Sequence, residues 1–351
     1  MATHSQTLAL VASPPVGNRP QWKLETVDLP ELRANELLVE IVAAGAGYVR
    51  RIGAKVKSAR PDDPVVLSFA SCSACTLCTS GHPAYCDSFV AINFIGAAAT
   101  FRSSTGGDVA GRFFGQSSFS KLAVVVETSV VNVSGKIDNP EELRLFAPLG
   151  CGLQTGAASV LNRAKATALD TVAVVGLGAV GMAAIMAAKI TGCSTIIGID
   201  IIPDRLQLAK EFGATAVIDS SSPEMDFTAE VKKVTNGNGP SVTIDATGIK
   251  SITEKALQFT ATLGTLVIVG VPSQTAELSL NLAQLMASGK VVMSSVEGDA
   301  SSSEFVPKMI QWYRQGKFPI DKLVKFYEVS DFESALTEMK DGTTIKPVLT
   351  W

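Results

Sequence analysis

Histidine is scarce in this sequence, and its scarcity restricts the metal chemistry that the protein can perform. Only two histidines, His4 and His82, occur among 351 residues. A catalytic zinc ion normally takes three protein ligands, usually including histidine, and keeps a fourth position open for water or substrate. Since His4 lies at the extreme N-terminus and His82 lies in a cysteine-rich loop, we expect neither to reach a catalytic centre.

A large excess of charge of one sign and long apolar segments are also missing. The formal net charge is −3 and the pI is near 5.6, which leaves no basic surface for neutralising phosphates and argues against nucleic acid as a partner. No apolar run reaches the roughly 18 residues of a membrane span, and residues 1–10 lack the charged and apolar segments of a secretory signal. We therefore expect a cytoplasmic protein that acts on a small molecule and binds no membrane.

The length predicts more than one domain, because 351 residues exceed an ordinary single core. Residues 37–69 contain short strand-like runs broken by glycine and proline, which indicates a β-rich unit. Residues 171–297 alternate short apolar runs with helical stretches, an α/β pattern that predicts six buried parallel strands. Residues 301–351 supply two amphipathic helices and a closing strand, which we expect to return to the first domain. The expected boundaries are 1–152, 153–296 and 297–351.

A glycine-rich turn follows the first strand of this α/β series. The strand Val172–Val175 leads into Gly176-Leu177-Gly178-Ala179-Val180-Gly181 and then into a helix. In a dinucleotide-binding turn, the first glycine permits the tight bend, the second lets the backbone approach a pyrophosphate, and the third allows the helix to pack on the strand. The helix N-terminus adds free N–H groups and a partial positive charge. The pattern favours a Rossmann cofactor site over a glycine turn in an unliganded domain.

Asp200 ends the next strand, close to the spacing that this fingerprint requires. Its carboxylate is expected to accept hydrogen bonds from the adenosine ribose and to repel a 2′-phosphate, so NAD(H) is favoured over NADP(H). The alternative is that Asp200 only caps the following turn. Arg205 lies nearby and is included among the candidate cofactor residues.

Four of the six cysteines, Cys72, Cys75, Cys78 and Cys86, are concentrated in one short loop. Four thiolates at these spacings can surround Zn²⁺ as a closed tetrahedron, which predicts a structural zinc site. An iron–sulfur cluster is the less favoured alternative because the last gap is longer than in the related cluster motif and no proline follows the last cysteine. Unliganded thiols are the other alternative. We expect His82 to be a surface residue of this loop and Cys193 to be a core residue.

These motifs together resemble the zinc-type medium-chain dehydrogenases over nearly the whole chain. The matching stretches are SCSACTLCTSGHPAYC, LGCGLQTGAASV, VVGLGAVG with Asp200, and DGTTIKPVL, and three further stretches, AINF, FFGQSSF and VEGD, are most similar to the aryl (benzyl) alcohol dehydrogenase branch. The resemblance implies a GroES-like catalytic domain, a Rossmann domain and a homodimer or homotetramer. It also implies that Thr155 touches the nicotinamide, Lys346 the pyrophosphate, and Val269 to Val271 the inner ribose.

One segment departs from the resemblance. The family's catalytic zinc takes a cysteine just after the strand ending in AAG, a histidine from a Gly-His-Glu before the next strand, and a cysteine at the domain junction. Here Gly45 runs directly into Ala46-Gly47-Tyr48, so only the junction cysteine, Cys151, remains. We therefore expect NAD(H) and one structural Zn²⁺, without a catalytic zinc.

Without a Lewis acid, oxidation of a simple alcohol loses several kcal/mol of transition-state stabilisation. We expect hydride transfer to or from an activated, conjugated or aromatic substrate. Candidate proton donors are Tyr48, Cys151 and Ser117 or its neighbour Ser118. A non-redox lyase, isomerase or cyclase with the same fold is an alternative, and an inactive, truncated dehydrogenase is another.

Overall fold

The structure is a computed structural model that describes residues 6–16, 19–95, 97–103 and 106–351. His4 lies outside the described residues. The chain divides into two compact units, and each is described by itself. The first unit contains residues 1–151, 301–310 and 320–351, and the second contains residues 152–300 and 311–319. Within the described part of the chain, no helix has the length and apolar character needed to cross a membrane.

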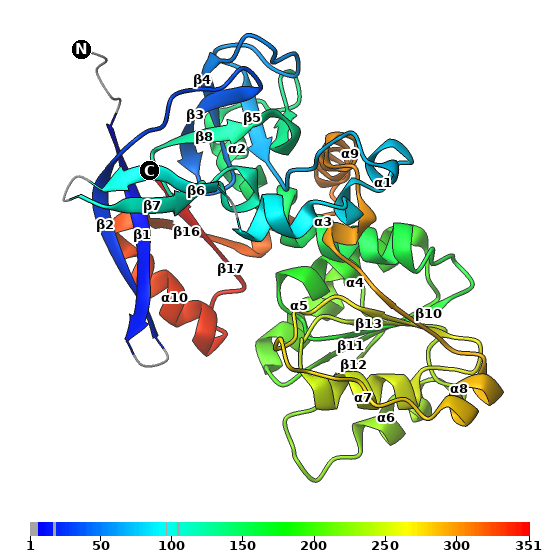
Figure 1. Cartoon of the computed structure of the whole chain (residues 1–351). Coiled ribbons are helices and arrows are strands. Elements are labelled where there is room, and N and C mark those ends of the chain that lie inside the picture. The colour runs from blue at the N-terminus through cyan, green and yellow to red at the C-terminus, as the bar shows by residue number, and fades with distance from the viewer. Residues whose placement is uncertain (1–5, 17–18, 96, 104–105) are drawn as a thin grey trace, which may run out of the picture. The chain divides into compact units, whose positions relative to one another are not determined.

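The first unit is built on two β-sheets (Figure 1). One has four strands in the order β1-β2-β6-β7, and the other has seven, in the order β16-β17-β3-β4-β5-β9 with β8 paired to β3. The strands are β1 (Gln6–Val16), β2 (Arg19–Asp28), β3 (Glu36–Ala43), β4 (Ala46–Ile52), β5 (Pro64–Leu67), β6 (Ala97–Ser103), β7 (Asp108–Gly111), β8 (Leu122–Val126), β9 (Val130–Asn132), β16 (Val324–Glu328) and β17 (Lys346–Thr350). The helices are α1 (Thr76–Thr79), α2 (Pro140–Phe146) and α10 (Phe332–Asp341).

Alternation of side chains along β3 positions the core of the larger sheet. Leu37, Val39 and Ile41 recur at every second residue and are fully buried on one side of the strand, together with Val49 and Val65 of the neighbouring strands. This period of two is the burial pattern of a strand with one face in the core.

A second cluster of the first unit joins the beginning of the chain to its end. Leu10 of β1 and Leu24 of β2 pack against Tyr327, Phe332 and Leu349. The apolar side chains of the N-terminal hairpin are therefore covered by residues of the C-terminal segment.

The strands β3 and β4 are joined by a turn of two residues, Ala44 and Gly45. Ala43 pairs with Ala46 across the hairpin, and Gly45 adopts a φ of +104°, a conformation that side chains with a Cβ rarely adopt. The turn is held on both sides, because the N–H of Ala44 donates to the carbonyl of Leu349 at 2.8 Å and the carbonyl of Gly45 accepts from the N–H of Leu67 at 2.7 Å. The short connection is thus integrated into the sheet.

The second unit confirms the predicted six-stranded parallel sheet. Its strand order is β12-β11-β10-β13-β14-β15, with every neighbouring pair parallel. The strands are β10 (Thr171–Val175), β11 (Thr195–Asp200), β12 (Ala216–Asp219), β13 (Val242–Asp245), β14 (Thr265–Ile268) and β15 (Val291–Ser294). The helices of this unit are α3 (Gly152–Ala158), α4 (Ala179–Thr191), α5 (Pro203–Phe212), α6 (Phe227–Val234), α7 (Lys250–Phe259) and α8 (Leu282–Ser288). α4 and α5 cover one face of the sheet, and α6 and α7 cover the other (Figure 1).

The strand order changes direction between β10 and β13, so the connections from these two strands lead to opposite sides of the sheet. In open parallel sheets, ligands bind at the carboxyl ends of the strands at such a switch point. Helix α9 (Ser302–Arg314) follows this unit in the chain, and its residues are divided between the two units.

Candidate functional site

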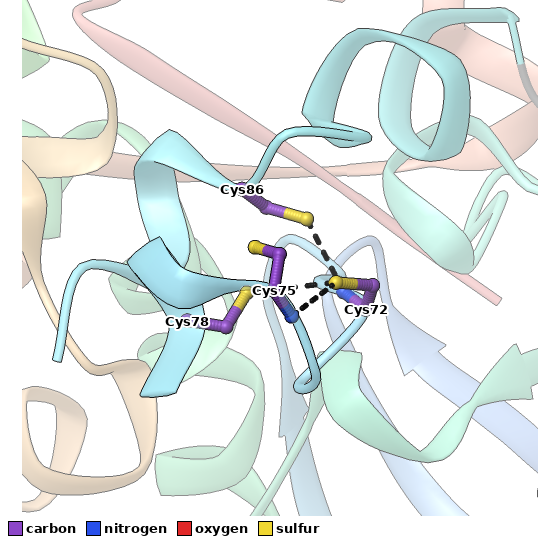
Figure 2. Close-up of side chains that lie close together, drawn as sticks. All are labelled: Cys72, Cys75, Cys78 and Cys86. Atoms are coloured by element: carbon purple, nitrogen blue, oxygen red, sulfur yellow. Dashed lines mark hydrogen bonds between the residues drawn. The ribbon is translucent and has the colours of Figure 1, made fainter. Parts of the chain in front are cut away.

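The four cysteines of the predicted zinc loop converge in the structure. Their sulfur atoms all lie within 4.8 Å of one another, and they point toward a common centre in Figure 2. The sulfurs of Cys72 and Cys78 are 3.9 Å apart, close to the ~3.8 Å edge of a tetrahedron with Zn–S distances of about 2.3 Å. The geometry and the four soft ligands fit a structural zinc ion.

The backbone around this loop favours a negatively charged sulfur at one corner. The N–H of Cys75 donates to the sulfur of Cys72 at 3.3 Å, and the N–H groups of Ala74 and Cys75 lower the pKa of the Cys72 thiol to about 6. Burial has the opposite effect on Cys78 and raises its pKa to about 12. Four adjacent thiolates repel one another, so a cation is required to hold all four in the deprotonated form.

The loop is attached to the first unit by an apolar cluster of its own. Phe69, Ala84, Cys86 and Phe89 are buried together. Across the described residues, the cysteine group is the one set of three or more histidine, cysteine or acidic side chains close enough to bind a metal. His82 belongs to the loop but not to the set, and its side chain is exposed. Cys193 is buried in the second unit, as expected for a core residue.

The glycine turn in the second unit has the backbone geometry that its sequence predicts. Gly176 has a φ of +85°. A Cβ on Gly181 would lie 1.9 Å from the carbonyl oxygen of Gly176, whereas a Cβ on Gly178 would meet open space. The turn is therefore tight at its first and third glycines and accessible at the second. α4 begins at Ala179, immediately after the turn, with Val180 in its first turn, so its N-terminal N–H groups are suited to bind a phosphate.

Asp200 caps the turn that follows it and also contacts the glycine turn. Its Oδ1 accepts hydrogen bonds from the N–H groups of Ile201 and Ile202 at 2.7 and 3.0 Å, which are the contacts of the capping alternative. Its Oδ2 accepts from the N–H of Leu177, inside the glycine turn, at 2.6 Å. The guanidinium of Arg205 lies 3.9 Å from the same oxygen. Asp200 therefore anchors the glycine turn as well as the turn that follows it.

Replacing Asp200 with alanine is expected to remove any preference for NADH over NADPH. If this buried carboxylate faces the adenosine ribose, as the fingerprint predicts, it would repel a 2′-phosphate, so we expect NADPH to bind at least about tenfold more weakly than NADH. Fluorescence titration of both cofactors against both proteins measures the two ratios. Equal affinities in the unaltered protein would show that Asp200 does not face the ribose.

A buried network that the sequence did not predict surrounds Thr155, on α3. Glu297 is 6 % exposed; its Oε2 accepts from the Gln154 amide at 3.2 Å and from the Thr155 hydroxyl at 3.4 Å. Glu297, Gly298 and Asp299 have φ values of +50°, +69° and +53°. Such a run is strained for the two residues with side chains. No local pattern predicts the network, because its members are separated by more than 140 residues.

The remaining predicted cofactor residues lie at strand ends. Val269 follows β14 and donates its N–H to the carbonyl of Asp245 at 2.8 Å. Val271 is 91 % exposed. Both belong to the second unit, at the carboxyl end of its sheet. Lys346 is the first residue of β17 in the first unit, and its N–H donates to the carbonyl of Leu323. The cofactor roles of these residues remain predictions.

The three predicted proton donors have different surroundings within the first unit. Tyr48 lies on β4, with the guanidinium of Arg50 5.7 Å from its ring centre. The Ser117 hydroxyl accepts from the N–H of Phe113 at 3.0 Å and so closes a turn in which Ser117 itself has a φ of +53°. Cys151 is exposed and directly follows the 3₁₀ turn Ala147–Gly150. Their catalytic roles remain predictions.

A buried ion pair precedes the Ser117 turn and was also not predicted. The guanidinium of Arg112 lies 2.7 Å from the Glu36 carboxylate, and their side chains are 9 % and 2 % exposed. The second carboxylate oxygen of Glu36 accepts from the N–H of Arg33 at 2.9 Å. Burial lowers the pKa of Arg112, and Glu36 opposes that shift. Arg112 has a φ of +64°, so the pair holds a left-handed residue at the start of the turn.

Comparison with known proteins agrees with these features. Residues 25–135 match the alcohol dehydrogenase GroES-like domain, and residues 179–315 match the zinc-binding dehydrogenase family. Geraniol dehydrogenase from Castellaniella defragrans is 35 % identical over 309 residues, covering 87 % of this chain and 81 % of that protein.

Two solved structures are similar over nearly their whole length. Benzyl alcohol dehydrogenase from Acinetobacter calcoaceticus is 33 % identical, with a TM-score of 0.89 and 99 % of both chains covered. An alcohol dehydrogenase zinc-binding domain protein from Burkholderia ambifaria is 34 % identical, with a TM-score of 0.90 and 98 % of both chains covered. The GroES-like and Rossmann assignments are thereby confirmed. The chain belongs to the zinc-type medium-chain alcohol dehydrogenase family, as a zinc-binding, alcohol dehydrogenase-like oxidoreductase.

Proposed function

We propose that this protein is an NAD(H)-dependent oxidoreductase that acts on activated, conjugated or aromatic substrates without a catalytic zinc ion. The observation that carries the proposal is the hairpin of Ala44 and Gly45. Two residues join β3 to β4 in this hairpin, whereas the resemblance implies a longer connection here that carries the first zinc ligand and the histidine. Of the three ligands that the resemblance implies, the sequence keeps Cys151, and one thiol does not make a catalytic zinc site.

The cofactor side of the proposal depends on the second unit. NAD(H), when bound, supplies the hydride donor or acceptor. The glycine turn from Gly176 to Gly181 and the N-terminus of α4 would hold the pyrophosphate, and Asp200 would hold the adenosine ribose. Thr155, held by Glu297, would orient the nicotinamide. These groups bind and align the cofactor, but they do not polarise a carbonyl oxygen.

The substrate must then supply the activation that zinc would provide. In a conjugated aldehyde, hydride adds to the β-carbon, and the negative charge that develops is shared between the α-carbon and the carbonyl oxygen as an enolate, which a proton donor then neutralises. The relatives named above support this class, because geraniol and benzyl alcohol both carry the alcohol carbon next to a π system. Tyr48, Ser117 and Cys151 are the proposed proton donors, since each carries an O–H or S–H group in the first unit.

The test compares two reactions of the purified protein. Benzyl alcohol with NAD⁺ is expected to give negligible turnover, since losing several kcal/mol of Lewis-acid stabilisation costs roughly a thousandfold or more in rate. Oxidation of NADH with a conjugated aldehyde is expected to continue in 1,10-phenanthroline, at concentrations where metal analysis shows the four-cysteine zinc still in place. Absorbance at the NADH band measures both reactions. Rapid benzyl alcohol oxidation that chelation abolishes would disprove the proposal.

We also propose that the protein forms a homodimer, or a homotetramer, through the second unit. β15 is at one edge of the parallel sheet. The helix that precedes β15 in the chain, α8, has no buried residue. Leu282 and Met286 of α8 are 75 % and 82 % exposed, and Val291 of β15 is 44 % exposed. Pairing of this edge strand with the same strand of a second copy would bury the exposed apolar side chains next to it.

A further inference from the structure

Asp245 is a fully buried carboxylate at the carboxyl end of β13. β13 pairs with β10, the strand that leads into the glycine turn (Figure 1), so Asp245 lies at the switch point of the sheet. A buried carboxylate is costly unless its oxygens are hydrogen-bonded. Its partners therefore indicate what it organises.

The side chain of Asp245 is bonded to two threonines that follow it in the chain. Oδ1 accepts from both the N–H and the hydroxyl of Thr247, at 2.9 and 2.6 Å. Oδ2 accepts from the hydroxyl of Thr253, on α7, at 2.5 Å. The Thr247 hydroxyl also accepts from the N–H of Ile249 at 3.1 Å, so its rotamer is fixed from both sides.

The backbone of Asp245 holds a second loop. Its carbonyl oxygen accepts from the N–H groups of Val269 and Gly270 at 2.8 and 3.0 Å. These residues begin the loop after β14. A single residue thus connects the loop after β13 to the loop after β14.

Both loops are packed without spare room. A Cβ on Gly176 would lie 3.0 Å from the Thr247 methyl group, so the Thr247 side chain packs against the glycine turn. A Cβ on Gly270 would lie 2.1 Å from the nitrogen of Gly248, so the two loops are in direct contact. The Thr247 methyl group therefore faces Gly176.

We propose that Asp245 is a positioning residue for the dinucleotide: it locks Thr247 behind Gly176 and aligns the loops after β13 and β14 into one rigid surface at the switch point. The inference rests on the proposed binding of NAD(H) to this unit. In the structure the two carboxylate oxygens accept all three side-chain bonds. An asparagine keeps one acceptor oxygen, and its NH₂ group would force the Thr253 hydroxyl to turn and accept instead of donating.

The experiment uses three substitutions, at Asp245 and its two threonine partners, and a matched control at Thr260, which directly follows α7 and contacts β13. Asp245→Asn, Thr247→Val and Thr253→Val each remove bonds to or from the carboxylate. The control is Thr260→Val, which removes a buried hydroxyl pair between Thr260 and Thr243 of β13, 2.7 Å apart. Full-length proteins are titrated with NADH by fluorescence, and their thermal unfolding is measured without cofactor.

We expect Asp245→Asn to weaken NADH binding tenfold or more, and the two valine variants threefold or more. Thr260→Val is expected to lower the unfolding temperature by a similar amount while its Kd stays within twofold of the unaltered protein. If Asp245→Asn does not fold, the two conservative valine variants decide the outcome.

Unchanged NADH affinity in folded Asp245→Asn, or in both valine variants, would overturn the inference. Equal weakening in Thr260→Val at an equal loss of stability would also overturn it, because the effect would then be one of stability alone. If the unaltered protein binds no NADH, the proposed function fails instead, and the two failures are thereby distinguished.

Discussion

Protein carrying Cys78→Ser is expected to retain less than about a tenth of a zinc ion per chain, whereas the unaltered protein contains about one. Serine cannot replace a thiolate ligand, and three sulfurs leave an open corner in a site whose sulfur atoms otherwise lie within 4.8 Å of one another. Structural zinc contributes ~10 kcal/mol or more of apparent free energy in small zinc-dependent domains. We expect the first unit to unfold about 10 °C or more below its normal temperature. Metal analysis and calorimetry measure the two effects.

The matched control is Cys193→Ser, which replaces a buried cysteine of the second unit that is outside the metal-binding group. This variant is expected to keep its full zinc content. Two tightly bound zinc ions in the unaltered protein would contradict the proposed loss of the catalytic site. Full zinc retention in Cys78→Ser would contradict the four-cysteine assignment.

Arg112→Met is expected to destabilise the first unit by about 3–5 kcal/mol, because it leaves the carboxylate of Glu36 buried without a cation. The side chain of Glu36 is 2 % exposed, so water cannot replace the lost partner. Adding Glu36→Gln to this variant removes the charge and retains an acceptor for the N–H of Arg33. The double variant is therefore expected to regain most of the lost stability. Urea denaturation of the single and double variants measures the coupling.

The control for this charge removal is Arg102→Met. Arg102 pairs with Asp108 at 3.8 Å, but their side chains are 78 % and 60 % exposed, and an exposed pair contributes little. We expect no measurable loss of stability. A loss as large as that of Arg112→Met would indicate that removal of an arginine side chain from this region, rather than an unpaired buried charge, is the cause.

The sequence predicted two kinds of feature: elements marked by a regular pattern of apolar residues, and sites whose residues lie close together in the chain. The six parallel strands were identified because buried strands read as continuous apolar runs between amphipathic helices. The cysteine loop was identified because all four ligands lie within 15 residues, from Cys72 to Cys86. The glycine turn was identified because a positive φ and a close packing contact both require glycine.

The contacts between distant residues could not be predicted in this way. Glu36 and Arg112 are ordinary surface residue types. Glu36 begins β3 of the seven-stranded sheet and Arg112 follows β7 of the four-stranded sheet, so their contact depends on how the two sheets of the first unit pack. The bond between Gln154 and Glu297 joins residues 143 positions apart. The segment Asp245-Ala246-Thr247 does contain a signal, since an aspartate side chain commonly accepts a hydrogen bond from the backbone N–H two residues on. Its connection to the loop after β14 depends on the register of two strands.

The packing of the N-terminal hairpin on the last residues of the chain has a consequence for synthesis on the ribosome. Leu10 and Leu24 are made first, and their partners Tyr327, Phe332 and Leu349 are made roughly 300 residues later. At about 5–20 residues per second, the delay is on the order of 15–60 s. During that time the apolar face of β1 and β2 lacks its native cover, so the nascent first unit is exposed to aggregation. The second unit is fully synthesised within this interval, and the first unit can complete its fold only after β16, α10 and β17 have been made.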